Sequence, residues 1–159
     1  MSSADEAGMR AAIAEARVGL SEGEYPYGAV LVDGTGNVLA KAHDTVFRDG
    51  DFSSHAETML VKGACRDLGR PSLAGLTLYT TTEPCPMCFT TAWLAQVDRV
   101  VFGTSMIEVR DLTGGLVEEV LVTPQQLNAL NSNRSMPVTG GVLRDECITL
   151  WDDVSRPDK

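Results

Sequence analysis

The stretch "TTTEPCPMCF", residues 80–89, places two thiols, Cys85 and Cys88, three residues apart directly after an apolar, β-rich run. Thiols at this spacing occur in redox pairs, in structural zinc sites and in catalytic metal sites. Pro86 suits the first turn of a helix, so the pattern predicts a short strand over residues 76–80 and a helix that starts near this proline. Both thiols therefore lie where a strand or loop gives way to a helix.

A second short stretch, "SSHAETM" at residues 53–59, supplies a histidine and a carboxylate upstream. Ser53 or Ser54 can cap a helix that runs from about His55 to Leu68. Helix starts in one right-handed α/β layer can lie side by side at the same edge of the sheet. An imidazole and two thiolates would then converge, and the positive potential of the helix N-termini favours thiolate over thiol.

The rest of the hydrophobic pattern predicts an α/β sandwich, because its strands alternate with helices that can act as crossover connections. Beyond residue 102, the glycine-rich segment 103–115 is expected to be irregular, and "TPQQLNALN" at 123–131 to be a short helix with a capping box. The expected elements outside the two motifs are a helix at 5–22, strands at 28–32, 38–43, 99–103 and near Val138, and a last helix from about Leu143 to Val154.

Length and composition predict one globular domain over residues 1–159. Hydrophobic residues make up 43% and charged residues 22% of the chain, which is ordinary for a globular protein. No apolar run approaches the ~18 residues of a membrane span, and "MSSADEAGMR" has no signal-peptide pattern. The sequence thus predicts a cytoplasmic protein without a membrane partner, whose four cysteines are thiols or metal ligands rather than disulfides.

The net charge argues against a nucleic-acid partner. Thirteen Lys and Arg against 22 Asp and Glu give -9, and the basic residues are scattered. Nucleic-acid binding relies on clustered Lys and Arg to displace counterions from phosphates. The same acidic charge also serves simply to keep a protein soluble.

A catalytic zinc site explains all the residues of the two motifs. Such a site takes three N or S ligands from the protein and keeps one position for water, which becomes acidic enough to supply hydroxide near neutral pH. His55, Cys85 and Cys88 provide the three ligands. Glu57 lies about 200° around the helix from His55, at ~100° per residue, so it need not bind the metal and can carry the proton of the water.

Three other interpretations stay open at this point. A thioredoxin-like redox pair also has Cys-x-x-Cys between a strand and a helix, but it leaves His55 and Glu57 unexplained. A structural zinc would need a fourth ligand; Cys65, ten residues beyond His55, lies roughly 15 Å along the helix axis and cannot close the site, while Cys147 and His43 remain formal candidates. In the third interpretation nothing binds and His55 is an ordinary helix-start histidine.

These residues resemble the cytidine deaminase superfamily, whose signature is H-x-E followed by P-C-x-x-C. Here the signature stands as "HAE" at residues 55–57 and "PCPMC" at residues 84–88, and the resemblance runs from about Met9 to Cys147. The zinc loop "TEPCPMC" is most similar to that of guanine deaminases, small zinc-dependent cytosine deaminases and tRNA adenosine deaminases.

The resemblance implies a fold, an assembly and a set of roles. The implied fold is a three-layer α/β/α sandwich around a five-stranded mixed sheet, assembled as a homodimer. His55, Cys85 and Cys88 would hold Zn²⁺. Glu57 would take a proton from the bound water, pass it to a ring nitrogen and then to the leaving amine. The backbone amide of Ala56 would line the substrate pocket.

The resemblance also suggests substrate-binding residues outside the signature. Glu83 stands directly before the proline of the zinc loop. In related small base deaminases the C-terminal segment closes over the pocket and brings an aromatic ring and an acid to the ligand, which would make Trp151 and Asp153 of "ITLWDDV" candidates. The alternative for this tail is a core tryptophan followed by solvated acids.

One position departs from the family pattern. The branch places an Asn eleven residues before the zinc histidine, where it hydrogen-bonds the base, and this chain has Asp44 there. An amide both donates and accepts, whereas a carboxylate only accepts. If Asp44 faces the ligand, we expect a substrate with an extra amino or imino group, such as an isocytosine, diaminopyrimidine, aminotriazine or guanine-like ring. The alternative is a loop aspartate that forms a turn with its own backbone.

The predicted function is a zinc-dependent hydrolytic deaminase of a free nucleobase or similar small heterocycle. A tRNA adenosine deaminase shares the core motifs, but it would need a cationic surface. From other classes, a zinc-binding protein without activity would not need Glu57, and a redox protein would oxidise Cys85 and Cys88 reversibly and hold no metal.

Overall fold

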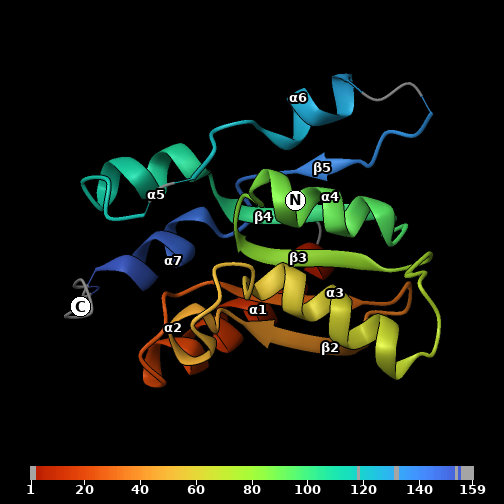
Figure 1. Ribbon diagram of the computed structural model, residues 1–159, viewed down its shortest axis with the longest axis horizontal. Coiled ribbons are helices and arrows are strands. Elements are labelled where there is room, and N and C mark those ends of the chain that lie inside the picture. The colour runs from red at the N-terminus through yellow and green to blue at the C-terminus, as the bar shows by residue number, and fades with distance from the viewer. Residues whose placement is uncertain (1–2, 118, 131–132, 153, 155–159) are drawn as a thin grey trace.

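The computed structural model describes residues 3–117, 119–130, 133–152 and 154. A five-stranded sheet runs through the molecule in the order β2-β1-β3-β4-β5 (Figure 1). Strands β1 and β2 lie where the sequence predicted strands and pair antiparallel, as do β1 and β3. Strands β3, β4 and β5 pair parallel, so the sheet is mixed as the resemblance implied. The strands are β1 Gly28–Val32, β2 Val38–His43, β3 Thr77–Thr82, β4 Arg99–Thr104 and β5 Val138–Thr139.

Helices α3 (Ala56–Asp67) and α4 (Pro86–Leu94) cover one face of the sheet (Figure 1). Successive residues of a strand point to opposite faces. Leu31 of β1 and Leu78 of β3 point to this face, where they are buried in one cluster with Phe89 of α4. This layer carries both sequence motifs.

Helices α1 (Ser3–Ser21) and α7 (Arg144–Ile148) cover the other face. Val30, the neighbour of Leu31 on β1, belongs to the cluster on this side. α1 approaches β1 so closely that a Cβ atom on Gly28 would lie 2.3 Å from the carbonyl oxygen of Ala12, which only glycine tolerates. The fold is a three-layer α/β/α sandwich, as predicted.

The predicted cap of α3 is wrong by one or two residues. Its N-cap is His55, with φ -67° and ψ 150°, rather than Ser53 or Ser54. Ser53 is engaged in the preceding loop, where its backbone N–H and its hydroxyl both donate to Asp51 at 2.8 Å. The histidine side chain makes no capping bond, so it is available for other contacts at the helix start.

Segment 103–115, predicted to be irregular, contains α5 (Met106–Leu112). Its start carries a full capping box: the Ser105 hydroxyl accepts from the Glu108 N–H at 3.2 Å, and the Glu108 carboxylate accepts from the Ser105 N–H at 2.8 Å. The predicted capping box at Thr123 is confirmed for α6 (Pro124–Ala129).

Two other expectations need correction. The segment between β2 and α3, where the sequence predicted no regular element, contains a one-turn helix, α2 (Val46–Asp49). The last helix is shorter than expected: α7 starts after Leu143, whose φ of 50° is left-handed, and gives way to a 3₁₀ turn at Thr149–Trp151.

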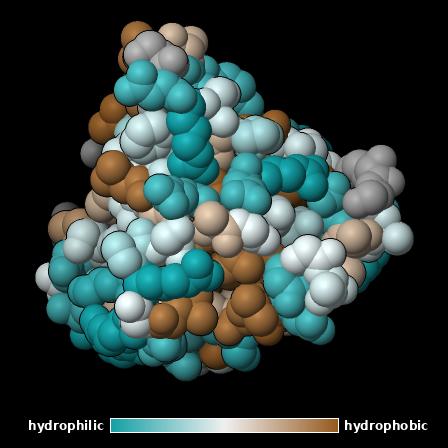
Figure 2. All heavy atoms as spheres, turned by 90° about the vertical axis from the view of Figure 1, so that its right-hand side faces the viewer, coloured by the Kyte–Doolittle hydropathy of each residue, from teal (hydrophilic) through white to brown (hydrophobic). Residues whose placement is uncertain are grey.

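Figure 2 shows the face at the end of the sheet where β3 begins and α3 ends, with hydrophobic side chains gathered in its lower half among hydrophilic ones. The starts of α3 and α4 lie at the opposite end of the sheet (Figure 1). Within the described residues, no helix is both long and apolar enough to cross a membrane.

Candidate metal centre and substrate pocket

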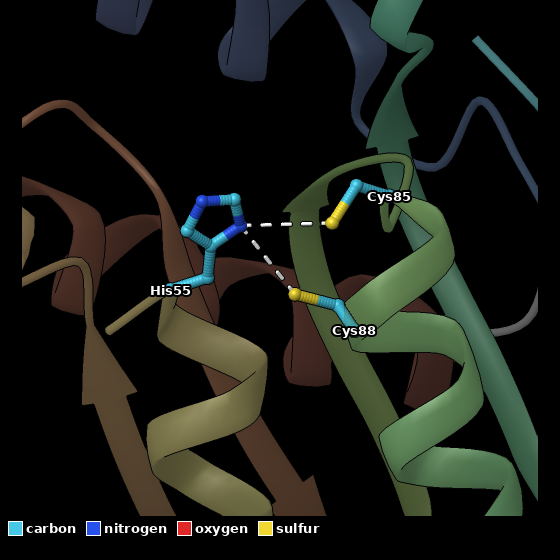
Figure 3. Close-up of side chains that lie close together, drawn as sticks. All are labelled: His55, Cys85 and Cys88. Atoms are coloured by element: carbon cyan, nitrogen blue, oxygen red, sulfur yellow. Dashed lines mark hydrogen bonds between the residues drawn. The ribbon is translucent and has the colours of Figure 1, made fainter. Parts of the chain in front are cut away.

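The starts of α3 and α4 bring one imidazole and two thiols together (Figure 3). His55 is the N-cap of α3, and Cys85 is the N-cap of α4 with φ -63° and ψ 167°. Cys88 lies in the first turn of α4. The Nδ1 atom of His55 is 3.6 Å from the Sγ atom of Cys85 and 3.6 Å from that of Cys88. The convergence expected from the two motifs is therefore present.

The electrostatics of the cluster favour a negatively charged sulfur. A hydrogen bond shared with Cys88, together with His55, lowers the pKa of Cys85 to about 4 despite its burial. The same hydrogen bond and burial raise the pKa of Cys88 well above its ordinary value. Burial opposes protonation of His55, but the Cys85 hydrogen bond and the nearby negative charges outweigh it and raise the imidazole pKa to about 9.

The donor set and its spacing fit zinc. Zn–S bonds of ~2.3 Å and a Zn–N bond of ~2.05 Å at a tetrahedral angle would set N and S ligand atoms about 3.6 Å apart. Both N–S distances in the structure have this value. Of the described His, Cys, Asp and Glu side chains, none joins these three as a fourth ligand. Three ligands are typical of a catalytic site and four of a structural one, so the structural interpretation loses its support.

Glu57 lies buried beside the cluster. Its side chain is 5% exposed, and its Oε1 atom accepts a hydrogen bond of 2.8 Å from the hydroxyl of Thr80 on β3. Burial, reinforced by the charge of Cys85, raises the pKa of Glu57. Burial makes the charged form of this carboxyl less favourable, which suits a group that takes up a proton and gives it back.

Two threonines that the sequence did not single out support these groups. Thr80 fixes the rotamer of Glu57 through the hydrogen bond above. The hydroxyl of Thr58 lies 3.5 Å from the Sγ atom of Cys88. Both residues occur inside or beside the motifs, but a threonine in a strand or in a first helical turn carries no functional signal by itself.

Asp44 lies in the loop after β2 and is 1% exposed. Its backbone N–H donates to the carbonyl oxygen of Tyr27 at 3.0 Å. Burial raises the pKa of its carboxyl to about 7; the charge of His55 lowers it, and the charges of Glu24 and Glu57 raise it. These charge interactions indicate that Asp44 lies near the metal cluster. Its carboxyl also accepts from the backbone N–H of Val46, two residues on, as the alternative of a turn with its own backbone expects, and contact of Asp44 with a substrate stays a prediction.

Glu83 holds the zinc loop to the next helix. Its Oε2 atom accepts from the N–H of Met106 at 3.2 Å, and its own N–H donates to the carbonyl oxygen of Thr104 at 2.7 Å. Ala56, the first residue of α3, is fully buried behind His55. Contacts of Glu83 and Ala56 with a substrate stay predictions.

A small pocket opens between the end of β3 and α5. Its lining combines apolar side chains with two carboxylates and one guanidinium. The lining residues are Tyr27, Thr82, Glu83, Met106, Val109, Arg110, Val117 and Glu119.

Glu119 is a candidate site residue that the sequence analysis missed. It is half-buried in the pocket wall, and burial, followed by the charge of Cys85, raises its pKa to about 7. The charges of Glu57 and Asp44 also act on it. Glu119 lies in a stretch without a motif, so nothing in the sequence indicated that it belongs to the site. Only the folded chain brings it to the pocket.

Aromatic rings close one side of the cluster. The Tyr27 ring stacks on His55 with 6.4 Å between ring centroids and 11° between planes. Trp151 is 4% exposed, and its ring centroid lies 5.2 Å from that of Tyr27. Trp151 is thus a core residue that reaches the cluster through Tyr27, and Asp153 lies outside the described residues.

Comparison with known proteins gives three findings. A family model described as "Cytidine and deoxycytidylate deaminase zinc-binding region" matches residues 2–104. The tRNA-specific adenosine deaminase of Bacillus subtilis (strain 168) is 38% identical over 90% of this chain and 83% of its own length. The probable cytosine deaminase of Schizosaccharomyces pombe is 32% identical over 96% of this chain and 95% of its own length.

Among solved structures, one from a study of A-to-I editing by tRNA:A34 deaminases at the wobble position of transfer RNA is similar in fold. It superposes with a TM-score of 0.73 and 31% identity, over 90% of this chain and 97% of that chain.

Proposed function

We propose that this chain, which belongs to the cytidine and deoxycytidylate deaminase zinc-binding family, is a zinc-dependent hydrolase. Its reaction removes an amino group from a free nucleobase or a similar small heterocycle. The observation that carries the proposal is the pairing of the three-ligand cluster with a buried carboxyl. His55, Cys85 and Cys88 form the cluster, and Glu57 lies beside it. A structural metal or a redox pair would have no use for that carboxyl.

The chemistry is the exchange of an amine for a carbonyl. Zinc, when bound by the His55–Cys85–Cys88 cluster, makes a coordinated water acidic enough to act as a nucleophile near neutral pH. Glu57 accepts a proton from water and gives it to a ring nitrogen, which makes the neighbouring amine-bearing carbon electrophilic. The water oxygen bonds to that carbon, the C–N bond breaks, and Glu57 delivers the remaining proton so that the amine leaves as ammonia.

The side chains around the cluster favour a small, uncharged substrate over a polyanion. Three carboxylates, Asp44, Glu57 and Glu119, interact electrostatically at the site. The pocket wall contains one guanidinium, that of Arg110, and its Nε and Nη2 atoms both donate to Asp111. A phosphate chain would find no Lys and no unpaired Arg among these lining residues, and phosphates are held by Lys and Arg. The net charge of -9 acts in the same direction.

The second candidate is a tRNA adenosine deaminase. The observation that favours it is the 38% identity with the tRNA-specific enzyme of Bacillus subtilis over most of both chains. This candidate predicts conversion of adenosine to inosine in tRNA and an affinity for tRNA that falls steeply as salt rises.

A direct assay tests both candidates. The zinc-loaded protein is incubated with aminated purines, pyrimidines, pterins and triazines, and in parallel with tRNA, while ammonia and inosine are measured. We expect ammonia release from at least one free heterocycle and none with Glu57→Ala. Inosine formation in tRNA without turnover of any free base would replace the first candidate by the second.

The homodimer predicted from the resemblance is part of this proposal. Exposed apolar side chains on the helices near the site are available for a subunit contact: Met87 and Leu94 on α4, and Ile107 and Leu112 on α5. Sedimentation at micromolar concentration is expected to give twice the mass of one chain.

A further inference from the structure

Asp44 has a buried oxygen that the protein leaves unpaired. Among the described residues, its Oδ1 atom is the one buried side-chain oxygen or nitrogen without a hydrogen-bond partner. Native proteins pair nearly all such atoms, because an unpaired buried polar group costs free energy. The unpaired Asp44 oxygen therefore raises the question of which hydrogen-bond donor it could bind.

A neighbouring carboxylate shows how the same region pairs a buried acid that serves the fold. Glu24 is 5% exposed, and its two oxygens accept from the backbone N–H groups of Phe47 and Arg48 at 2.9 and 2.7 Å. Those bonds satisfy the start of α2. The charge of Glu24 raises the pKa of Asp44, whose carboxyl accepts a hydrogen bond from the backbone N–H of Val46 but whose Oδ1 atom has no partner.

The position of Asp44 connects that oxygen to the reacting site. Its backbone is bonded to Tyr27, whose ring stacks on His55. The next residue, Thr45, donates its N–H at 3.0 Å to the carbonyl oxygen of Ser54, the residue before His55. The loop of Asp44 is thus fixed to both sides of the metal cluster, and its carboxyl interacts electrostatically with Glu57.

In its ionised form a carboxyl group accepts hydrogen bonds and does not donate them. The pKa of Asp44 is about 7 in this structure, and a ligand N–H that bonds to the carboxylate lowers that pKa and so favours the ionised form. A ligand that presents a carbonyl oxygen or a bare ring nitrogen to Asp44 would meet repulsion. A ligand that presents an amino group or a ring N–H would form a charge-assisted hydrogen bond, which is stronger than a neutral one.

We infer that Asp44 makes the site selective for heterocycles that carry a second N–H donor beside the amine that is removed, such as diaminopyrimidines, diaminopurines and amino-oxo rings of the isocytosine type. The inference rests on the proposed function, because it assigns the substrate class of the same site. Asp44 Oδ1 is closed to solvent in this structure, so the Tyr27 ring or the loop at residues 44–54 moves aside when such a ligand enters.

Two bases that differ at carbon 2 test this. Cytosine and 2,4-diaminopyrimidine share the amine at carbon 4, but carbon 2 bears a carbonyl in cytosine and an amine in diaminopyrimidine. Ring nitrogen 1 also carries a hydrogen only in cytosine, so 1-methylcytosine, which lacks that hydrogen, is measured as a second carbonyl-bearing reference. Binding of each base to the zinc-loaded Glu57→Gln protein is measured by calorimetry, which requires no turnover. Ammonia release from each is measured with the wild-type protein.

We expect 2,4-diaminopyrimidine to bind more tightly than cytosine by a factor on the order of 10 to 100, the range for one hydrogen bond to a charged group. Adding Asp44→Asn to the Glu57→Gln protein should remove at least about tenfold of that preference, because an amide can also donate to a carbonyl. Asp51→Asn is the matched control: it changes an exposed carboxylate of the same loop and should leave the preference intact.

The outcomes separate the inference from the proposed function. Equal binding of the two bases, tighter binding of cytosine, an unchanged preference in the Asp44→Asn protein, or no measurable binding of either base would each overturn the role of Asp44. An Asp44-dependent binding preference without ammonia release would retain that role and remove the deaminase proposal. The comparison of the bases in the Glu57→Gln protein needs no Asp44 variant, so equal or reversed binding there overturns the inference even if Asp44→Asn fails to fold.

Discussion

The metal-ligand end of the molecule and the wall of its pocket are built in different ways. His55 and Cys85 each begin a helix of nine residues or more that packs on the central sheet. The pocket wall beside them includes the seven-residue α5 and the chain after it, which carries Glu119. A metal site tolerates little displacement of its ligands, and regular elements hold them in place. The wall needs only to present the right chemistry, so it is the place where substrate preference can differ among proteins that share the ligand cluster.

The largest effect is expected from removing one ligand. Cys88→Ser should abolish zinc binding near neutral pH and reduce deamination to background, because a serine hydroxyl replaces a zinc-binding thiolate. Zinc content by mass spectrometry and ammonia release check both expectations. Cys65→Ser is the matched control, since Cys65 lies near the other end of α3 and should retain zinc and activity. Full zinc content in Cys88→Ser would refute the three-ligand assignment.

Glu57→Gln tests the carboxyl beside the cluster. The amide keeps the size and the hydrogen bond from Thr80 but cannot carry a proton, so kcat should fall by about 10²- to 10⁴-fold, the usual worth of general acid–base catalysis. Zinc content should stay at the wild-type level. A variant that keeps both zinc and wild-type kcat would show that another group moves the proton.

Asp44 joins the two regions, and its burial predicts a pH dependence of stability. Its pKa lies at about 7 in the folded protein against an ordinary value of 3.8, so between these values the folded state holds more protons than the unfolded state. The contribution of this group to the free energy of unfolding is fully present below about pH 4. It is lost as the pH rises towards 7, by up to about 1.4 kcal/mol per pH unit. Urea unfolding of metal-free protein should show wild type losing stability relative to Asp44→Asn over this range; parallel curves would contradict the burial of a protonated Asp44.

Glu119→Gln tests whether the wall takes part in the reaction. We expect kcat/KM to fall about tenfold, which corresponds to the loss of one hydrogen bond to a charged acceptor. Zinc content should not change, because Glu119 is not among the ligand residues. Glu146→Gln, the same chemical change at an exposed carboxylate on α7, is the control and should retain wild-type kcat/KM.

The smallest effect is expected at the cap of α5. Ser105→Ala removes the hydroxyl that accepts from the N–H of Glu108, which should lower the free energy of unfolding by about 1 kcal/mol. Chemical denaturation measures this value, and Thr123→Ala, which removes the equivalent bond at α6, gives a comparison outside the pocket wall. A loss well above that at Thr123 would show that the cap of α5 also supports the zinc loop through Glu83 and Met106.

The motif end could be predicted in detail because its information is local. Proline at the first helical position, apolar strands bounded by turns and the spacing of "HAE" and "PCPMC" placed β3, α3 and α4 within one or two residues. The wall could not be predicted as well. Its glycines, Gly114 and Gly115, led to the prediction of an irregular segment. The capping box that starts α5 just upstream was therefore not recognised.

The sequence by itself determined the α/β class, the family and the ligand set, because each follows from residue types at short, fixed spacings. Only the tertiary structure decided which groups surround that set: the Thr80 hydroxyl on Glu57, the Tyr27 ring on His55, and the carboxyls of Asp44 and Glu119. These groups come from segments separated by tens of residues. Their meeting depends on strand order and on the close packing of helices against the sheet, which no local pattern encodes.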